Sequence, residues 1–145
     1  MIKGYLASPF FNENELFIYK EVISILRNNK NIDLYVPMEH KIPGAYDISN
    51  QEWGRRVFEM DIKAMDDCDV VIVLNYGMYS DTGTAWETGY AFAKGKDIYQ
   101  VLCMDNKTDY SIMMINGSGT VMTLEDLRDR NIPIQNNVLD SINQK

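Results

Sequence analysis

The sequence predicts an α/β fold in which helices cover both faces of a parallel sheet. Strand-like and helix-like segments alternate from one end of the chain to the other, as in repeated βαβ units. The segment 69–76, DVVIVLNY, is apolar almost throughout, as expected for a strand buried on both faces of such a sheet. With 145 residues, 46% of them hydrophobic and 24% charged, the chain fits a single domain over residues 1–145.

The N-terminal part contains two strands and a helix. Residues 2–7 predict a first strand, and the segment SPFF separates it from a helix that begins near Asn12. Residues 32–37 predict a second strand. Residues 38–50 contain a proline and a glycine and have no periodicity, so they predict a long loop, which in a compact domain is often functional.

The rest of the chain continues this alternation. Residues 51–66 predict an amphipathic helix that turns Phe58, Ile62 and Met65 toward the core. A third strand is predicted at 69–76, and the helix after it stops at the KGK of 94–96. A fourth strand follows at 97–104 and a fifth at 119–123. The last helix opens at Thr123, with Asp126 in the capping-box position. The polar tail from residue 136 receives no assignment.

Five strands of this kind most often adopt the flavodoxin-like, doubly wound order 2-1-3-4-5, with right-handed crossovers. In that arrangement a ligand binds beyond the carboxyl ends of strands 1 and 3, where the winding reverses. The loops at this point are residues 7–12 and 76–86.

Charge and composition exclude several classes of partner and site. The formal charge of −7 and the lack of a basic patch argue against nucleic acid or an anionic membrane as the main partner. Cys68 and Cys103 lack CxxC spacing, and His40 is the single histidine, so free thiols in a reducing cytoplasm are favoured over a disulfide or a zinc site. Residues 1–9 lack the apolar core of a signal peptide, and a cytoplasmic protein is expected.

Two carboxylates, Asp81 and Glu87, lie close together in the stretch SDTGTAWETGYAFAKGK, at the expected site. Thr84 and Glu87 fit the capping box S/T-x-x-E, which would make the glutamate a structural residue. The alternative is a functional role, because the amides and the dipole at a helix start favour ionised acids, and an ionised, positioned carboxylate can act as a nucleophile.

Asp61 is a third candidate, since it lies beside the apolar stripe of its helix and should be partly shielded. A shielded aspartate has either a partner or a raised pKa, and a raised pKa suits a general acid. The alternative is an aspartate on the helix surface that interacts with Arg56 or Lys63 by way of solvent. Among the aromatic residues, Tyr5 lies in the first strand near the reversal of the strand order. An apolar slot for a planar ligand could be lined by Phe10, Phe11 and Trp53, and each aromatic residue has a core role as its alternative.

The motifs of nucleotide cofactors and of Ser-His-Asp or Cys-His catalysis are absent from the sequence. Carboxylates without a metal or a cofactor indicate glycosyl chemistry, in which one acid attacks the anomeric carbon and another group assists the leaving group. We therefore expect no metal and no cofactor.

At this point the sequence resembles the nucleoside 2-deoxyribosyltransferases. The similarity is carried by the four segments GYLASPFF at 4–11, WGRRVFEMDIKAMDDCDVVIVL at 53–74, DTGTAWETGYAFAKGK at 81–96 and YSIMMINGSG at 110–119. The most specific part is the D-x-G-x-x-x-E-x-G-Y-A pattern at 81–91.

The resemblance implies that Glu87 attacks C1′ of a 2′-deoxynucleoside and holds the deoxyribosyl group as an ester, and that Tyr5 orients it. It implies that Asp81 binds sugar hydroxyls and that Asp61 protonates the leaving base and later accepts a proton from the incoming one. Two inversions at C1′ give retention overall. The aromatic positions that would stack on the base are Phe10, Phe11 and Trp53.

The family also implies a homo-oligomer, a hexamer or smaller, with sites completed across subunits. Where the family often has Asn-x-Met reaching into a neighbouring site, this chain has Ser111-Ile112-Met113, which replaces the amide by a shorter hydroxyl. The exposed, methionine-rich segment 111–122 suits such an interface. The partners implied are 2′-deoxynucleosides and free nucleobases, purine, pyrimidine or both.

The residues leave two alternative functions open. A 2′-deoxynucleoside 5′-monophosphate N-hydrolase has the same acid layout but needs a phosphate cradle, and ASPFFNEN after the first strand offers one serine and no basic residue. A non-catalytic flavodoxin-like nucleotide-binding or receiver module is the other, although a receiver would carry an aspartate where this chain has Asn75.

Overall fold

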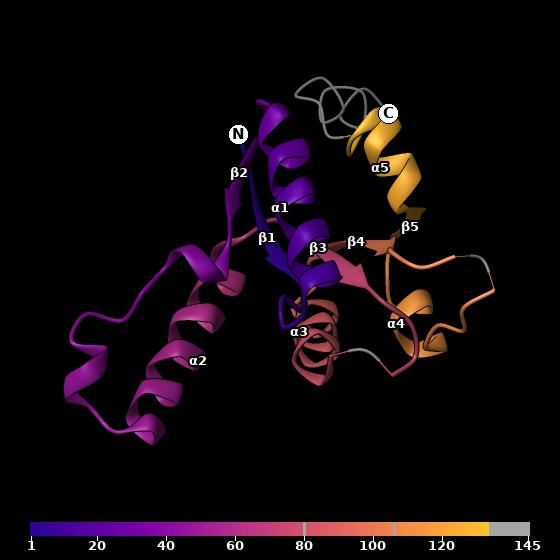
Figure 1. Cartoon of the computed structure of the whole chain (residues 1–145). Helices are drawn as coiled ribbons and strands as arrows, with labels where there is room; N and C mark the ends of the chain where they lie inside the picture. Colours follow the sequence, from indigo (N-terminus) through magenta and orange to yellow (C-terminus); the bar gives the residue numbers. More distant parts are fainter. Residues whose placement is uncertain (80, 106, 134–145) are drawn as a thin grey trace.

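The computed structural model describes residues 1–79, 81–105 and 107–133 (Figure 1). Its sheet contains five strands, all parallel, in the order β2-β1-β3-β4-β5, so the predicted flavodoxin-like α/β fold is confirmed. The strands are β1 (Ile2–Ala7), β2 (Ile32–Tyr35), β3 (Val70–Asn75), β4 (Asp97–Leu102) and β5 (Thr120–Thr123). The tail from residue 136 lies outside the described residues.

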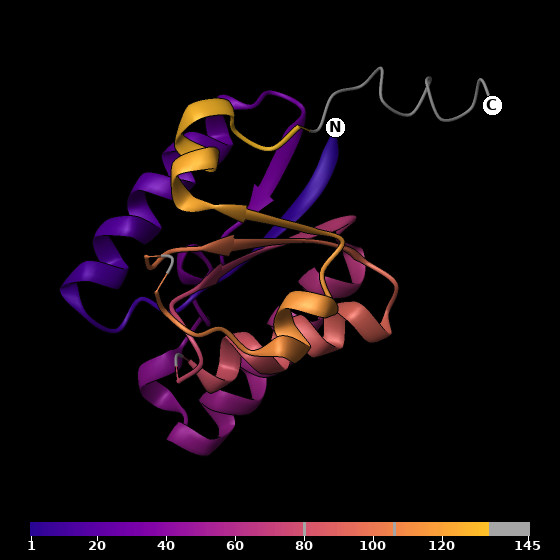
Figure 2. The ribbon, with the colours of Figure 1, turned by 90° about the vertical axis from the view of Figure 1, so that its right-hand side faces the viewer.

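Helices cover both faces of the sheet (Figure 2). On one face lie α1 (Glu13–Asn28) and α5 (Leu124–Arg130), and on the other lie α2 (Asn50–Asp67), α3 (Thr82–Ala93) and the short α4 (Ile112–Asn116). The capping box that the sequence predicts at Thr123 and Asp126 opens α5. In the described part of the chain, no helix has both the length and the apolarity that a membrane span needs.

The core divides into two apolar clusters, one on each side of the sheet. Alternate strand residues supply them: Leu6 and Ile72 pack under α1, whereas Tyr5 and Val71 face α2 and α3. Every residue of β3 is buried, as its continuous apolarity predicts. Neither thiol forms a disulfide, and Cys68 is buried while Cys103 is half-buried.

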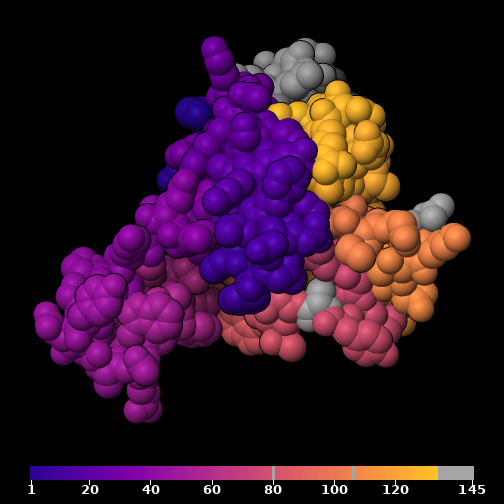
Figure 3. Space-filling view, in the orientation of Figure 1, coloured from indigo at the N-terminus to yellow at the C-terminus, as the bar shows by residue number. Residues whose placement is uncertain are grey.

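The structure of residues 36–60 differs from the prediction in two respects, the predicted loop and the position of Phe58. The predicted loop contains two short 3-10 helices, η1 (Pro37–Glu39) and η2 (Ala45–Asp47). This segment and the start of α2 project from the sheet (Figures 1 and 3), so Met65 is the buried residue of that helix. The prediction that Phe58 faces the core is wrong: its side chain is 53% exposed and packs edge-on against Trp86, because the sheet does not reach this far.

Candidate active site

A cleft of about 760 Å³ opens where the strand order reverses. The loop after β1 contributes Ser8, Phe10 and Phe11, and the start of α3 contributes Asp81 and Gly83. The opposite wall comes from the projecting segment, residues 37–47, and from α2. Both loops that the fold class singles out, 7–12 and 76–86, therefore border the cleft.

Glu87 enters this cleft from the second turn of α3. The Tyr5 hydroxyl, from β1, donates a hydrogen bond to its Oε2. Burial raises the pKa of Glu87 to about 7, with the charges of Asp61 and Asp81 adding to the effect and the Tyr5 bond opposing it. The carboxylate is thus largely removed from water but keeps one strong donor.

Tyr5 is fully buried, and burial together with the Glu87 charge raises the pKa of its hydroxyl far above the ordinary range. The phenol therefore stays protonated and acts as a donor at any neutral pH.

Asp61 lines the same cleft from α2. Burial raises its pKa to about 6, while the charge of His40 acts in the opposite direction. Its Oδ1 is buried and has no hydrogen-bond partner among the described residues. The expected shielding is therefore present, and Arg56, one of the two residues in the surface alternative, pairs with Glu52 instead, at 2.9 Å. A carboxyl in such a place can hold a proton at neutral pH and give it up.

Asp81 is the N-cap of α3. Its Oδ2 accepts hydrogen bonds from the backbone N–H and the hydroxyl of Thr84, both at 2.8 Å. The capping-box interpretation of Thr84 and Glu87 is therefore wrong: the helix starts at Thr82, and Thr84 is inside it and 1% exposed. Because Asp81 already satisfies the end of the helix, the Glu87 carboxylate is available to Tyr5.

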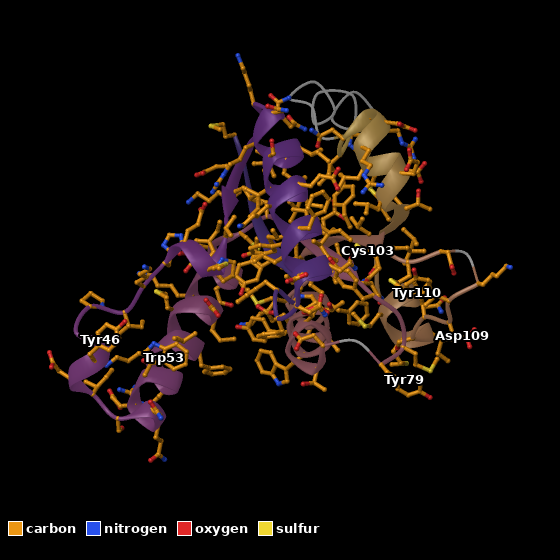
Figure 4. The ribbon with its side chains drawn as sticks, in the orientation of Figure 1. Tyr46, Trp53, Tyr79, Cys103, Asp109 and Tyr110 are labelled. Atoms are coloured by element: carbon orange, nitrogen blue, oxygen red, sulfur yellow. The ribbon has the colours of Figure 1, made fainter. Side chains whose placement is uncertain are left out.

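The three aromatic candidates Phe10, Phe11 and Trp53 all border the cleft. Phe10 also packs against Tyr19 of the core, with ring centroids 5.3 Å apart, so it borders the cleft and the core at once. Trp53 is 46% exposed and lies with Tyr46 on the projecting segment (Figure 4). Apolar rings and carboxyl groups thus line the same cleft.

Ser111 and Met113 do not reach this cleft in their own chain. The Ser111 hydroxyl accepts from the Met114 N–H and caps α4. Met113 is 78% exposed and borders a separate groove, of about 340 Å³, together with Phe92. A buried network holds α4 in place, because the amide nitrogen of Gln100 donates to the Ser118 hydroxyl and to the Met114 carbonyl.

Sequence patterns did not single out several polar residues of the cleft, among them His40 and Lys41, which lie on its wall just after η1. Their signal was only the length of the predicted loop, because neither belongs to a motif or a periodic pattern. Among the described residues, no three His, Cys, Asp or Glu side chains cluster as a metal site does.

The chain resembles known proteins in both sequence and fold. Residues 4–126 match the family model described as nucleoside 2-deoxyribosyltransferase. The nucleoside deoxyribosyltransferase of Lactobacillus leichmannii is 25% identical over 137 residues, covering 88% of this chain and 87% of that protein. The structure of a 2-deoxyribosyltransferase from Bacillus psychrosaccharolyticus matches with a TM-score of 0.78 at 27% identity, covering 94% of this chain and 95% of that one.

A CMP N-glycosidase from Clostridium botulinum shares the fold, with a TM-score of 0.60 at 19% identity over 87% of this chain and 98% of that one. The family match spans the sheet, the cleft and the helices that carry all three acids. The chain belongs to the nucleoside 2-deoxyribosyltransferase family.

Proposed function

We propose that the protein transfers the 2-deoxyribosyl group between purine or pyrimidine bases of 2′-deoxynucleosides. The observation that carries the proposal is the half-buried Glu87, held by the Tyr5 hydroxyl in the same cleft as a second carboxyl, Asp61, whose Oδ1 lacks a partner among the described residues. One carboxyl is oriented as a nucleophile, and the other is left to exchange a proton. Membership of the family supports the same reaction.

The reaction proceeds in two displacements. The Glu87 carboxylate attacks C1′, the bond from C1′ to the base nitrogen breaks, and the departing base takes its electron pair together with a proton from Asp61. The incoming base then loses a proton to Asp61 and attacks C1′, and the ester to Glu87 breaks. Each step inverts C1′, so the configuration is retained overall.

The chemistry of the sugar explains why two carboxyls suffice. A 2′-deoxyribosyl group lacks the electron-withdrawing 2′-hydroxyl that opposes an oxocarbenium-like transition state. A carboxylate on one side and a protonated base on the other then lower the barrier without a metal. In this scheme Asp81 binds the sugar hydroxyls, while Phe10, Phe11 and Trp53 stack on the base.

We also propose that the protein works as a homo-oligomer, a hexamer or smaller, in the cytoplasm. Ser111 and Met113 of one subunit would complete the cleft of another, and the high exposure of Ile112 and Met113, 73% and 78%, supports an interface there. Free Cys68 and Cys103 suit a reducing compartment.

The test is base exchange. Incubation with 2′-deoxyinosine and adenine should yield deoxyadenosine and hypoxanthine, separated by liquid chromatography. Glu87→Gln should lose at least about a thousandfold in rate, since it removes the nucleophile. Glu125→Gln, an exposed glutamate of α5, is the matched control and should retain the wild-type rate. Exchange that persists in Glu87→Gln would exclude the proposed nucleophile.

A second candidate is hydrolysis of 2′-deoxynucleoside 5′-monophosphates, and the position of Lys41 on the cleft wall favours it. An ammonium group there could bind a 5′-phosphate, which the segment after β1 alone could not. The assay offers 2′-deoxynucleotides without a second base. Release of 2-deoxyribose 5-phosphate that falls strongly in Lys41→Met would favour the hydrolase, whereas exchange of nucleosides without such release would exclude it.

A further inference from the structure

Three aromatic rings form a column that ends at the proposed nucleophile. The Tyr5 ring stacks on the Tyr35 ring, with centroids 5.7 Å apart and planes 9° from parallel. The His40 ring also stacks on Tyr35, with centroids 4.0 Å apart and planes 7° from parallel. Tyr5 is the inner end of this column, and its hydroxyl donates the hydrogen bond to Glu87.

The backbone produces this column. Tyr5 and Tyr35 are direct partners in the register of β1 and β2, so their side chains leave the sheet on the same face. The chain then turns through η1, and the N–H of His40 bonds to the Pro37 carbonyl, which brings the imidazole back over Tyr35. Register and one helical turn are therefore enough to line up three rings from separate elements.

The position of Tyr5 matters because its hydroxyl opposes the desolvation of Glu87. That bond lowers the pKa of a carboxyl that burial raises. A shift of the Tyr5 ring would lengthen the bond, raise the pKa of Glu87 further and leave the nucleophile free to rotate. The one ring that stacks on Tyr5 among the described residues is Tyr35.

The hydroxyl of Tyr35 does not explain its place in the column. It is buried and has no hydrogen-bond partner among the described residues. A buried, unpaired hydroxyl costs stability, which phenylalanine would avoid. What Tyr35 contributes is therefore its ring, which stacks on both Tyr5 and His40.

We propose that Tyr35 is a positioning residue for Glu87, acting through the Tyr5 ring, and that His40 closes the outer end of the column. The inference rests on the proposed function only in taking Glu87 as the nucleophile. Tyr35 itself borders a different hollow and not the cleft that holds Glu87. Its effect on the reaction must therefore be indirect.

The experiment titrates Glu87 directly, without substrate. Glutamate labelled with ¹³C at the carboxyl carbon is incorporated, and the Glu87 signal is assigned by its loss in Glu87→Gln. The wild-type midpoint is expected near 7. Tyr35→Leu should raise this midpoint by about 0.5 to 1 pH unit, since it loosens the Tyr5 bond. Tyr35→Phe should restore it, and His40→Ala should raise it by less than Tyr35→Leu does.

Kinetics provide the second readout. In base exchange, Tyr35→Leu should lower kcat about tenfold with little change in KM, because it perturbs the nucleophile and not the binding groups. Tyr99→Leu is the matched control, since it truncates a 7% exposed tyrosine of β4 outside the site and should leave the midpoint and kcat unchanged.

Two outcomes would overturn the inference. One is a folded Tyr35→Leu protein with the wild-type midpoint, and the other is a Tyr99→Leu protein with an equal shift, which would mark the change as general loosening. If the wild-type protein exchanges no bases, the proposed function fails, but the titration still decides whether the column positions Glu87. The two failures are therefore distinguishable.

Discussion

Glu87 and Asp61 have raised pKa values for the same reason, burial, yet the proposed reaction needs them in opposite protonation states. Glu87 must be ionised to attack C1′, and Asp61 must hold a proton for the leaving base. The pKa is about 7 for Glu87 and about 6 for Asp61, so between pH 6 and pH 7 the two carboxyls together hold one proton. The reactive form places this proton on Asp61.

We therefore expect kcat/KM for base exchange to follow a bell-shaped pH profile with its maximum between about 6 and 7. Below this range both acids are protonated and Glu87 cannot attack; above it both are ionised and Asp61 has no proton to give. Asp61→Asn should lower the rate by about 10²- to 10⁴-fold and lose the alkaline limb. Initial rates at constant ionic strength measure this, and a flat profile would contradict it.

Ionisation of Glu87 should also destabilise the folded protein. Because its folded-state pKa is raised from 4.5 to about 7, stability that is present at low pH is lost as the pH rises through this window. Glu87→Gln carries no charge and still offers Tyr5 an acceptor. Urea unfolding should show the variant to be more stable by about 3 kcal/mol at pH 8 and equal to wild type at pH 4. The same difference at both pH values would refute this explanation.

The sequence was sufficient to find the three acids but not the ring column. Glu87 and Asp81 share one helix start, and Asp61 lies beside an apolar stripe, so local spacing reveals all three. The stack of Tyr35 and His40 depends on the register of two parallel strands and on the turn of η1. Neither of these leaves a periodic signal in the sequence.

At the scale of the element, the start of α3 combines structure and chemistry in one residue. Asp81 caps the helix through Oδ2 and lies on the wall of the cleft. Asp81→Asn keeps a good N-cap and removes the charge, whereas Asp81→Ala removes both. We expect both variants to lose base exchange, but only the alanine to lose stability, by about 1 kcal/mol.

Thermal unfolding and the exchange assay, run on the same preparations, measure this difference. If Asp81→Asn retained full activity, Asp81 would be a cap and nothing more. If both variants lost the same stability, the capping geometry would not explain the residue.

The regular elements were predictable because their signals are strong and local. β3 is apolar throughout, and α1 and α2 have helical spacing over several turns. α4 was missed because a helix of five residues is too short to show a period. The inward position of Phe58 was wrong because helical spacing defines a face of the helix, but not how far the sheet extends beneath it.

At the scale of the whole molecule, the strand order explains why the cleft and α4 lie apart. The reversal between β1 and β3 opens the cleft, while β4 and β5 carry α4 to the other side of α3. A single chain therefore keeps Met113 away from its own Glu87. A second copy that placed its α4 at this cleft would bring the two residues together.

Association through α4 should be sensitive to charge. Ile112→Asp places a carboxylate on a side chain that is 73% exposed, and we expect it to shift the protein toward its 16.7 kDa monomer and to lower base exchange at least about tenfold. Phe17→Asp on α1, at a residue that is 69% exposed, is the matched control and should change neither mass nor rate. Light scattering measures the mass, and circular dichroism checks that both variants fold.

Complementation decides whether neighbouring subunits share a site. Glu87→Gln lacks the nucleophile and Met113→Asp alters the segment proposed to enter the neighbour, so each variant alone should be inactive. In a mixed dimer, one cleft combines both defects, while the other pairs an intact Glu87 with an intact Met113. Equal mixing with free exchange of subunits should therefore restore about a quarter of the wild-type rate. A mixture as inactive as its components, with exchange verified by mass, would show that each chain completes its own site.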